Sequence, residues 1–138
     1  MSDLVEEEEA GAAKPPYLQV GGDAGVRALV DRFYDLMDRE PTYAVIRRLH
    51  AHDLARAREK LHLYLSGWLG GPNLYIERFG HPMLRARHLP FSIGVPERDA
   101  WLACITQAMQ ETGVPDALQE PLAAAFFKTA DWMRNRTE

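Results

Sequence analysis

The sequence predicts an all-α fold in a single domain. Apolar residues recur every three or four positions over four long segments, which is the period of an amphipathic helix. Glycine and proline pairs separate these segments, and strand signals are almost absent. Four substantial helices joined by short, broken connections are typical of a helical domain in a chain of 138 residues.

The first long helix is expected to begin near Asp23 and to end before Pro41. Asp23 is a candidate N-cap, and a proline disfavours helical geometry in the residue before it. The helix face that we expect to be buried consists of Val26, Leu29, Val30, Phe33, Tyr34 and Met37. A short helical piece is expected over residues 42–50.

The second long helix is expected to begin near Asp53 and to end at the Gly-Gly-Pro stretch 70–72. Its inward face consists of Leu54, Ala57, Leu61, Leu65 and Trp68. Gly80 and Pro82 interrupt the next segment, so only short helical turns fit there. Pro82 suits the first turn of a helix that leads to His88.

The third and fourth long helices complete the set. The third is expected from about Pro96 to the Gly-Val-Pro stretch 113–115, and the fourth over about 117–135. The inward positions of the third are Trp101, Ile105, Ala108, Met109 and Thr112. Those of the fourth are Leu118, Leu122, Ala125, Phe126, Ala130 and Met133.

The charge divides the chain into an acidic start and a neutral body. Residues 1–14 carry five acidic side chains and one lysine, whereas residues 15–138 carry equal numbers of acidic and basic side chains. We expect residues 1–16 to be a disordered acidic extension and residues 17–138 to form the domain. A neutral body argues against binding to nucleic acid, which calls for a clearly basic domain.

Composition also indicates the compartment. The acidic start lacks the basic and apolar regions of a signal peptide, and no apolar run approaches the length of a membrane span. The single cysteine, Cys104, excludes an internal disulfide and fits a reducing compartment. The sequence therefore predicts a cytoplasmic protein without membrane contact.

Residues 70–95 are poor in regular structure yet rich in apolar and basic side chains. Two long helices on either side would have to flank this weak middle, so we expect a large, flat, apolar cofactor to fill the space. His88 is a candidate metal ligand on one side of that space. Tyr34, Trp101 and His50 are candidate hydrogen-bond donors on the other, His50 only if its facing nitrogen carries the proton.

Each of these residues also has an ordinary structural interpretation. Taken alone, His88 is typical of a helix cap or a surface residue, and Tyr34 and Trp101 are typical of core aromatics. His62 is expected to be exposed. Cys104 is expected to be a small buried residue.

Several stretches, in this order and with these gaps, resemble the group II truncated haemoglobins. The resemblance rests on "DRFYDLM" at 31–37, "GWLGGP" at 67–72, "GHPMLRARHLPF" at 80–91 and "ERDAWL" at 97–102. The paired glycines at 21–22 and 70–71 are similar to the two hinge motifs of that family. The resemblance covers about residues 17–135 and implies a truncated globin fold, a two-on-two helical sandwich around haem b.

The same resemblance implies roles for the candidate residues. His88 matches the proximal ligand, whose imidazole nitrogen binds the iron. Tyr34 matches the distal tyrosine of the family and Trp101 its distal tryptophan, while His50 matches the residue at the bend before the second long helix. These three form the implied distal donor network.

Further positions are implied to contact the cofactor. A small residue at Ala57 opens a side route to the iron, and Leu61 lies over the haem face. Lys60 and Arg85 are the main candidates to bind the anionic propionates. The other expected cofactor contacts are Phe33, Leu54, Tyr75, His81, Leu84, Phe91, Ile93 and Ile105.

The resemblance implies a protein that binds O2 and other diatomic ligands, NO and CO. Donors aimed at a partly charged ligand contribute about 1.5–3 kcal/mol each, so two of them slow O2 release by about 10²- to 10⁴-fold. Slow release argues against bulk oxygen transport. NO dioxygenase or peroxidase-like activity is a further expectation. Such turnover needs a separate reductase, because the chain has no nucleotide-binding motif.

A second function class stays open. The protein is then a haem-based gas or redox sensor, or a partner-binding module whose acidic start meets the partner. Both functions are compatible with a monomer or a homodimer.

Overall fold

Four long helices carry the fold, and they are the four that the apolar periodicity predicts. They are α3 (Gly22–Arg39), α5 (Ala55–Trp68), α8 (Val95–Glu111) and α9 (Asp116–Trp132). This computed structural model describes residues 14–137, which contain no strand. The all-α prediction is therefore confirmed over that range, whereas most of the predicted extension 1–16 lies outside it.

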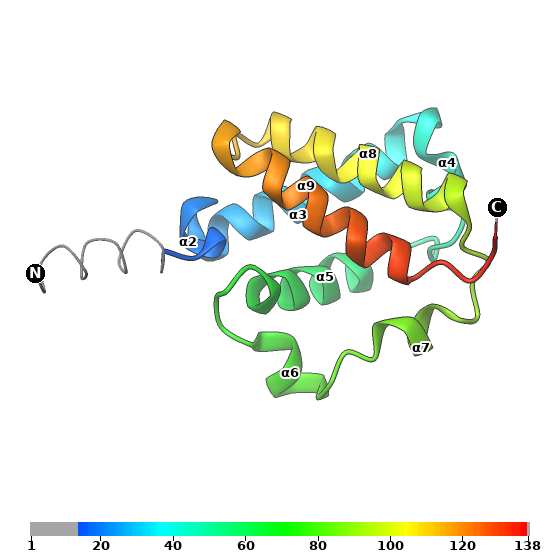
Figure 1. Ribbon diagram of the computed structural model, residues 1–138, viewed down its shortest axis with the longest axis horizontal. Helices are drawn as coiled ribbons and strands as arrows, with labels where there is room; N and C mark the ends of the chain where they lie inside the picture. Colours follow the sequence, from blue (N-terminus) through cyan, green and yellow to red (C-terminus); the bar gives the residue numbers. More distant parts are fainter. Residues whose placement is uncertain (1–13, 138) are drawn as a thin grey trace, which may run out of the picture.

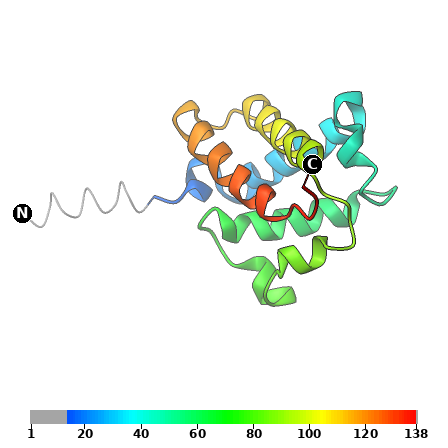
Figure 2. The same cartoon turned by 45° about the vertical axis from the view of Figure 1, so that its right-hand side comes forward.

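The long helices form two layers. Helices α8 and α9 form an antiparallel pair, α3 packs against α8, and α5 packs against α3 (Figures 1 and 2). The short elements lie at the edges of these layers. They are α2 (Pro16–Gln19), the 3-10 turn η1 (Pro41–Tyr43), α4 (Ala44–Arg47), α6 (Leu74–Phe79) and α7 (Leu84–His88). No helix within residues 14–137 is long and apolar enough to cross a membrane.

The tightest core lies where α3 meets α8. Its side chains are at most 1% exposed, and each Val, Leu, Ile, Phe or Met among them stabilises the fold by about 1.5–3 kcal/mol when fully buried. They are Val26, Leu29, Val30, Phe33, Cys104, Ile105, Ala108 and Met109. The Cys104 thiol donates to the Phe33 carbonyl over 3.3 Å, so the predicted burial of this residue is confirmed.

The start of α3 differs from the prediction. Gly21, with a φ of 109°, is the N-cap, and no side chain caps the helix there. The Asp23 carboxylate instead lies 2.7 Å from Nε2 of His62, whose ring is buried, and Arg27 lies 3.3 Å from Nδ1 of that ring. The predictions of Asp23 as the N-cap and of an exposed His62 were wrong, because the buried imidazole recruits the carboxylate as its partner.

Glycines allow two segments near the N-terminal end of α3 to approach closely. A Cβ on Gly25 would lie 1.8 Å from the Val20 carbonyl oxygen, and a Cβ on Gly71 would lie 2.5 Å from the Tyr17 ring. Tyr17 N–H also donates to the Leu69 carbonyl over 2.9 Å. These contacts join α2 to the start of α3 and to the end of α5.

The middle of the chain is fragmented, as predicted, but α7 begins later than expected. Its N-cap is Met83 in the left-handed region, with a φ of 48°, so Pro82 lies outside the helix rather than in its first turn. None of the side chains of α7 is buried. The segment that carries His88 therefore has little apolar packing of its own.

Candidate functional site

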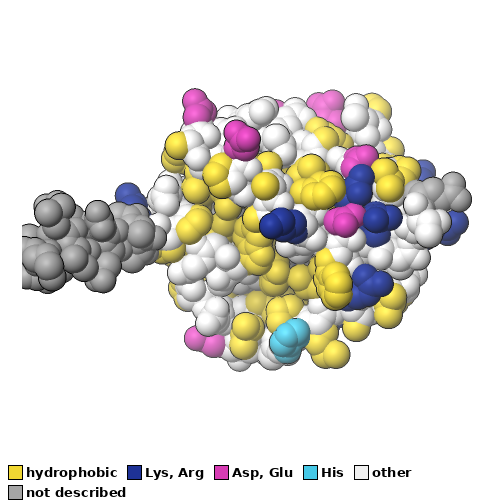
Figure 3. Space-filling view, in the orientation of Figure 1, with side chains coloured by type: hydrophobic (Ala, Val, Ile, Leu, Met, Phe, Trp, Pro, Cys, Tyr) yellow, Lys and Arg dark blue, Asp and Glu magenta, His cyan; other side chains and the backbone are white. Residues whose placement is uncertain are grey.

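A cavity of about 280 Å³ lies between the two layers, beside α7. Side chains from α3, α5, α8 and α9 reach it, together with the segments that flank α7. Figure 3 shows apolar side chains gathered in the middle of the face seen in Figure 1, with Lys and Arg side chains to one side. An apolar cavity with a few convergent polar groups is typical of a ligand or cofactor site.

His88, whose imidazole is a candidate metal ligand, lines the cavity. Nδ1 of His88 lies 2.6 Å from the Leu84 carbonyl oxygen. Because a carbonyl only accepts, Nδ1 carries the proton and Nε2 keeps its lone pair. Residues 14–137 contain no group of three His, Cys, Asp or Glu side chains able to hold a metal ion. A lone imidazole of this kind therefore suits a metal whose other ligands come from a cofactor.

Two neutral donors line the same cavity, Tyr34 from α3 and Trp101 from α8. Burial raises the pKa of Tyr34 above its ordinary value, more than the nearby Arg58 cation lowers it. Edge-on contacts fix both rings, since the Phe33 ring centroid lies 5.0 Å from that of Tyr34 and 5.3 Å from that of Trp101. The Tyr34 hydroxyl thus stays protonated and is held in place as a donor.

His50 also lines the cavity, but as an acceptor. Its Nδ1 lies 2.8 Å from the Ile46 carbonyl oxygen, so the neutral ring carries its proton on Nδ1 and presents a bare Nε2. Burial lowers the pKa of His50 more than the hydrogen bond to Ile46 raises it, and the nearby Arg47 cation lowers it further. The donor role considered for His50 requires a proton on the facing nitrogen, which this tautomer lacks.

Three cations, Arg56, Lys60 and Arg87, lie near the cavity. Lys60 and Arg87 directly precede two lining residues in the chain, Leu61 and His88. Burial lowers the pKa of Lys60, and the cations of Arg56 and Arg87 lower it further. Lys60 Nζ also lies 5.5 Å from the centre of the Phe79 ring. Crowded cations of this kind attract carboxylate groups.

The structure brings together half of the residues predicted for the site. Those that line the cavity are Tyr34, His50, Leu61, Leu84, His88, Phe91, Ile93 and Trp101. Those that do not line it are Phe33, Leu54, Ala57, Lys60, Tyr75, His81, Arg85 and Ile105.

The second group has other surroundings. Phe33, Leu54 and Ile105 lie in the core, and Ala57 packs against that core. Tyr75 is buried, with its ring centroid 6.2 Å from that of Tyr64. His81 is exposed, and its Nδ1 accepts from the Met83 N–H over 3.0 Å. Arg85 is directed toward the carbonyl of Trp132, 2.6 Å away, instead of toward the cavity.

Sequence reasoning missed much of the lining. The additional residues are Ile46, Leu49, Tyr64, Leu65, Trp68, Glu97, Arg98, Phe126, Thr129, Ala130 and Met133. Three of them, Phe126, Thr129 and Ala130, lie on helix α9, and its C-cap Met133 continues the same spacing. The apolar periodicity predicted this helix face but not whether the face meets a cofactor or the core. Trp68 stacks on Phe126 with 4.5 Å between the ring centroids, so these two rings form one wall.

A helical sandwich in which one free imidazole nitrogen shares an apolar cavity with aromatic donors is typical of a class of proteins, the haem proteins that bind small ligands. Comparison with known proteins identifies the family. The sequence pattern of the bacterial-like globin family matches residues 16–135. This chain belongs to that family, and its similarity to group II truncated haemoglobins extends over nearly its whole length.

Individual relatives show how close the similarity is. Group 2 truncated hemoglobin YjbI of Bacillus subtilis (strain 168) is 40% identical over 123 residues, which is 89% of this chain and 90% of that protein. The group II 2-on-2 hemoglobin of the plant pathogen Agrobacterium tumefaciens is 47% identical with a TM-score of 0.84, covering 88% of this chain and 94% of that one. The cold-adapted truncated hemoglobin of the Antarctic marine bacterium Pseudoalteromonas haloplanktis TAC125 is 39% identical with a TM-score of 0.86, covering 89% and 99%.

These similarities confirm the two-on-two truncated globin fold and haem as the cofactor, which in this family is usually of the b type. The side chains around the cavity fit such a group. His88 offers a lone-pair nitrogen, the lining is mostly apolar, and cations lie beside it. Proteins of this family bind small diatomic ligands such as O2.

Proposed function

We propose that this protein holds haem through Nε2 of His88 and retains O2, NO or CO by hydrogen bonds from Tyr34 and Trp101. When bound, haem would supply an iron able to take up a small diatomic ligand. The observation that carries the proposal is the placement of one free imidazole nitrogen, one buried donor (Tyr34) and one partly buried donor (Trp101) around a single cavity.

The two donors act on charge that develops on the ligand. A Tyr hydroxyl and an indole N–H in an apolar cavity form stronger hydrogen bonds to a partly negative oxygen than they do in water. Neither donor needs to reorient, because aromatic contacts hold both rings. Retention of ligand, with slow release, therefore suits this site better than bulk oxygen transport.

The cations complete the site. Lys60, Arg56 and Arg87 would hold the propionate carboxylates, and the low pKa of Lys60 rises once an anion neutralises its neighbours. We assign this role to Arg87 in place of Arg85, because Arg87 lies near Lys60 and donates to the Pro82 carbonyl only through Nε, whereas Nη1 of Arg85 is directed to the carbonyls of Trp132 and Arg134.

Replacing Trp101 by Phe tests the donor role. Loss of one charge-assisted hydrogen bond of about 1.5–3 kcal/mol is expected to raise the O2 dissociation rate by about ten- to a hundredfold. Stopped-flow replacement of O2 by CO measures this rate. Tyr17→Phe is the control, because it also removes one aromatic hydrogen-bond donor, whereas Tyr17 lies outside the cavity lining. Equal rates in both variants contradict the proposal.

His50 favours a second candidate function, the breakdown of peroxide. Its bare Nε2 can accept a proton from hydrogen peroxide but offers none to O2. We expect His50→Leu to slow reaction with hydrogen peroxide by at least about tenfold and to change the O2 dissociation rate by less than about twofold. A similar loss in both measurements would show that His50 acts only by packing. Turnover of peroxide or NO would draw electrons from a separate reductase.

A further inference from the structure

The helix that carries the proposed iron ligand is held by few apolar contacts. Helix α7 has five residues, buries none of its side chains, and follows Met83 in the left-handed region. Pro90 lies two residues beyond His88, so the chain cannot continue as a helix there. Apolar packing therefore does not fix α7, and polar contacts must do so.

Several polar contacts of residues 88–93 converge on one residue near the C-terminus, Asn135. Its side-chain Nδ2 donates to the Phe91 carbonyl over 2.7 Å and to the His88 carbonyl over 3.3 Å. Its Oδ1 accepts from the Ile93 N–H over 2.9 Å, and its own N–H donates to the Ile93 carbonyl over 2.9 Å. One asparagine thus uses both ends of its amide and its backbone to fasten residues 88–93.

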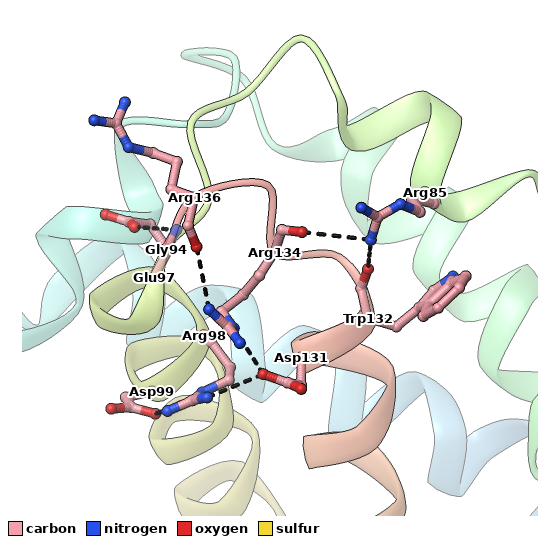
Figure 4. A network of polar contacts seen from close by, with 9 residues as sticks. All are labelled: Arg85, Gly94, Glu97, Arg98, Asp99, Asp131, Trp132, Arg134 and Arg136. Carbon is pink, nitrogen blue, oxygen red and sulfur yellow. Dashed lines mark hydrogen bonds and ion pairs between the residues drawn. The ribbon is translucent and has the colours of Figure 1, made fainter. Parts of the chain in front are cut away.

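Arg85 makes a second tie from α7 to the same part of the chain. Its guanidinium donates to the carbonyls of Trp132, over 2.6 Å, and Arg134, over 3.4 Å (Figure 4). It also lies over the Trp132 ring, 5.1 Å from its centre. These contacts therefore hold α7 at two points, the Arg85 side chain and the His88 carbonyl.

The segment that provides these ties is itself anchored. Asp131 accepts from Arg134 over 2.7 Å and from Arg98 of α8 over 3.0 Å (Figure 4). Arg136 donates to Ser92 over 2.8 Å. Residues 132–136 are thus fixed to α8 and α9 at one side and to the α7 segment at the other.

We propose that residues 132–136 form a C-terminal clamp that positions His88, with Asn135 as the central positioning residue. The proposal rests on the proposed function, in which His88 binds the iron. Because Nδ1 of His88 is tied to the Leu84 carbonyl, the direction of the ring follows the backbone of α7. Asn135 restrains that backbone at the His88 carbonyl, so the clamp sets the orientation of the ring and the retention of haem.

The substitution Asn135→Asp tests the clamp, since it keeps the shape and the acceptor for Ile93 but removes the donors to His88 and Phe91. Resonance Raman of the ferrous holoprotein should show a shifted or broadened iron–imidazole stretching band. Each lost hydrogen bond corresponds to about a two- to tenfold change in an equilibrium constant, so haem transfer to excess apomyoglobin should accelerate by about that factor.

Gln119→Glu is the matched control. It makes the same change from amide to carboxylate, and Gln119 donates to the Val114 carbonyl over 2.8 Å at the opposite end of α9. Arg85→Gln is an independent test that decides the matter if Asn135→Asp does not fold, and it should move the band and the transfer rate in the same directions. The clamp is overturned if both test variants behave like Gln119→Glu.

The variant His88→Gly separates the two proposals. Loss of the iron–imidazole band in His88→Gly, with no effect in the clamp variants, overturns the clamp alone. Retention of the native band in His88→Gly without added imidazole overturns the ligand assignment itself, and the clamp with it.

Discussion

Burial decides which protons the polar side chains of the cavity carry. Desolvation raises the pKa of Tyr34, so its hydroxyl keeps its proton even in alkaline solution. His50 is an acceptor because its Nδ1–H donates to the Ile46 carbonyl and leaves Nε2 bare. Sequence reasoning found the residue types but left the tautomer of His50 open. The tautomer depends on a carbonyl four residues earlier, whose direction is set only once α4 has folded.

The raised pKa of Tyr34 predicts a flat pH profile for ligand release. The hydroxyl stays protonated as the pH passes about 10, the ordinary value for tyrosine, so the O2 dissociation rate should not rise there. Stability behaves differently. Above about pH 10 the unfolded chain loses a proton that the folded protein keeps, so the free energy of unfolding falls as the pH rises.

Stopped-flow dissociation and urea unfolding between about pH 8 and 11 measure the two effects. Tyr34→Phe serves as the control, because it removes the titrating group and should lessen the alkaline loss of stability. A dissociation rate that rises steeply near pH 10 in the native protein, but not in Tyr34→Phe, would contradict a raised pKa.

Periodicity located every long helix, while the short elements followed no such signal. The starts and ends of α3, α5, α8 and α9 lie within a few residues of their predicted positions. Helix α2 was not predicted, and α7 starts after Pro82 because Met83 adopts a left-handed conformation that no residue pattern announces. Helices of four or five residues depend on their neighbours more than on their own composition.

At Gly25 we expect the usual preference of a helix for Ala over Gly to be reversed. In a free helix, Gly→Ala stabilises by about 1 kcal/mol. Here the added Cβ would meet the Val20 carbonyl at 1.8 Å, so Gly25→Ala should lower the free energy of unfolding by about 3 kcal/mol.

Gly113→Ala is the control, since its Cβ meets open space and only the positive φ costs about 1–2 kcal/mol. Urea unfolding with a constant m-value measures both. A loss at Gly25 no larger than that at Gly113 would contradict a rigid junction.

The molecule combines a dense half and a half built around the cavity. The core between α3 and α8 is complete without a cofactor, whereas α7 and the residues after it pack on little but the C-terminal segment. Periodicity alone predicted the amphipathic faces but not how the layers are arranged. The resemblance to truncated globins provided that arrangement, and the family match confirms it.

Haem removal should therefore act on one half of the molecule. We expect amide hydrogen exchange, followed by mass spectrometry, to show lost protection over residues 84–94 and 132–137 in the apoprotein. Protection of α3 and α8 should persist, because most of their buried side chains pack against one another in the core and only a few, such as Tyr34 and Trp101, face the cavity. Uniform loss over all four long helices would show that the core depends on the cofactor.

The placement of Cys104 has a practical consequence for solution studies. Burial raises the pKa of its thiol to about 12, so only about one molecule in 10⁵ holds a thiolate at neutral pH. Since the chain has no other cysteine, its surface offers no thiol that reacts with maleimides and similar reagents. A cysteine introduced at any exposed position would accept a fluorophore or spin label without background, and distance changes upon gas uptake would become measurable in an otherwise unaltered chain.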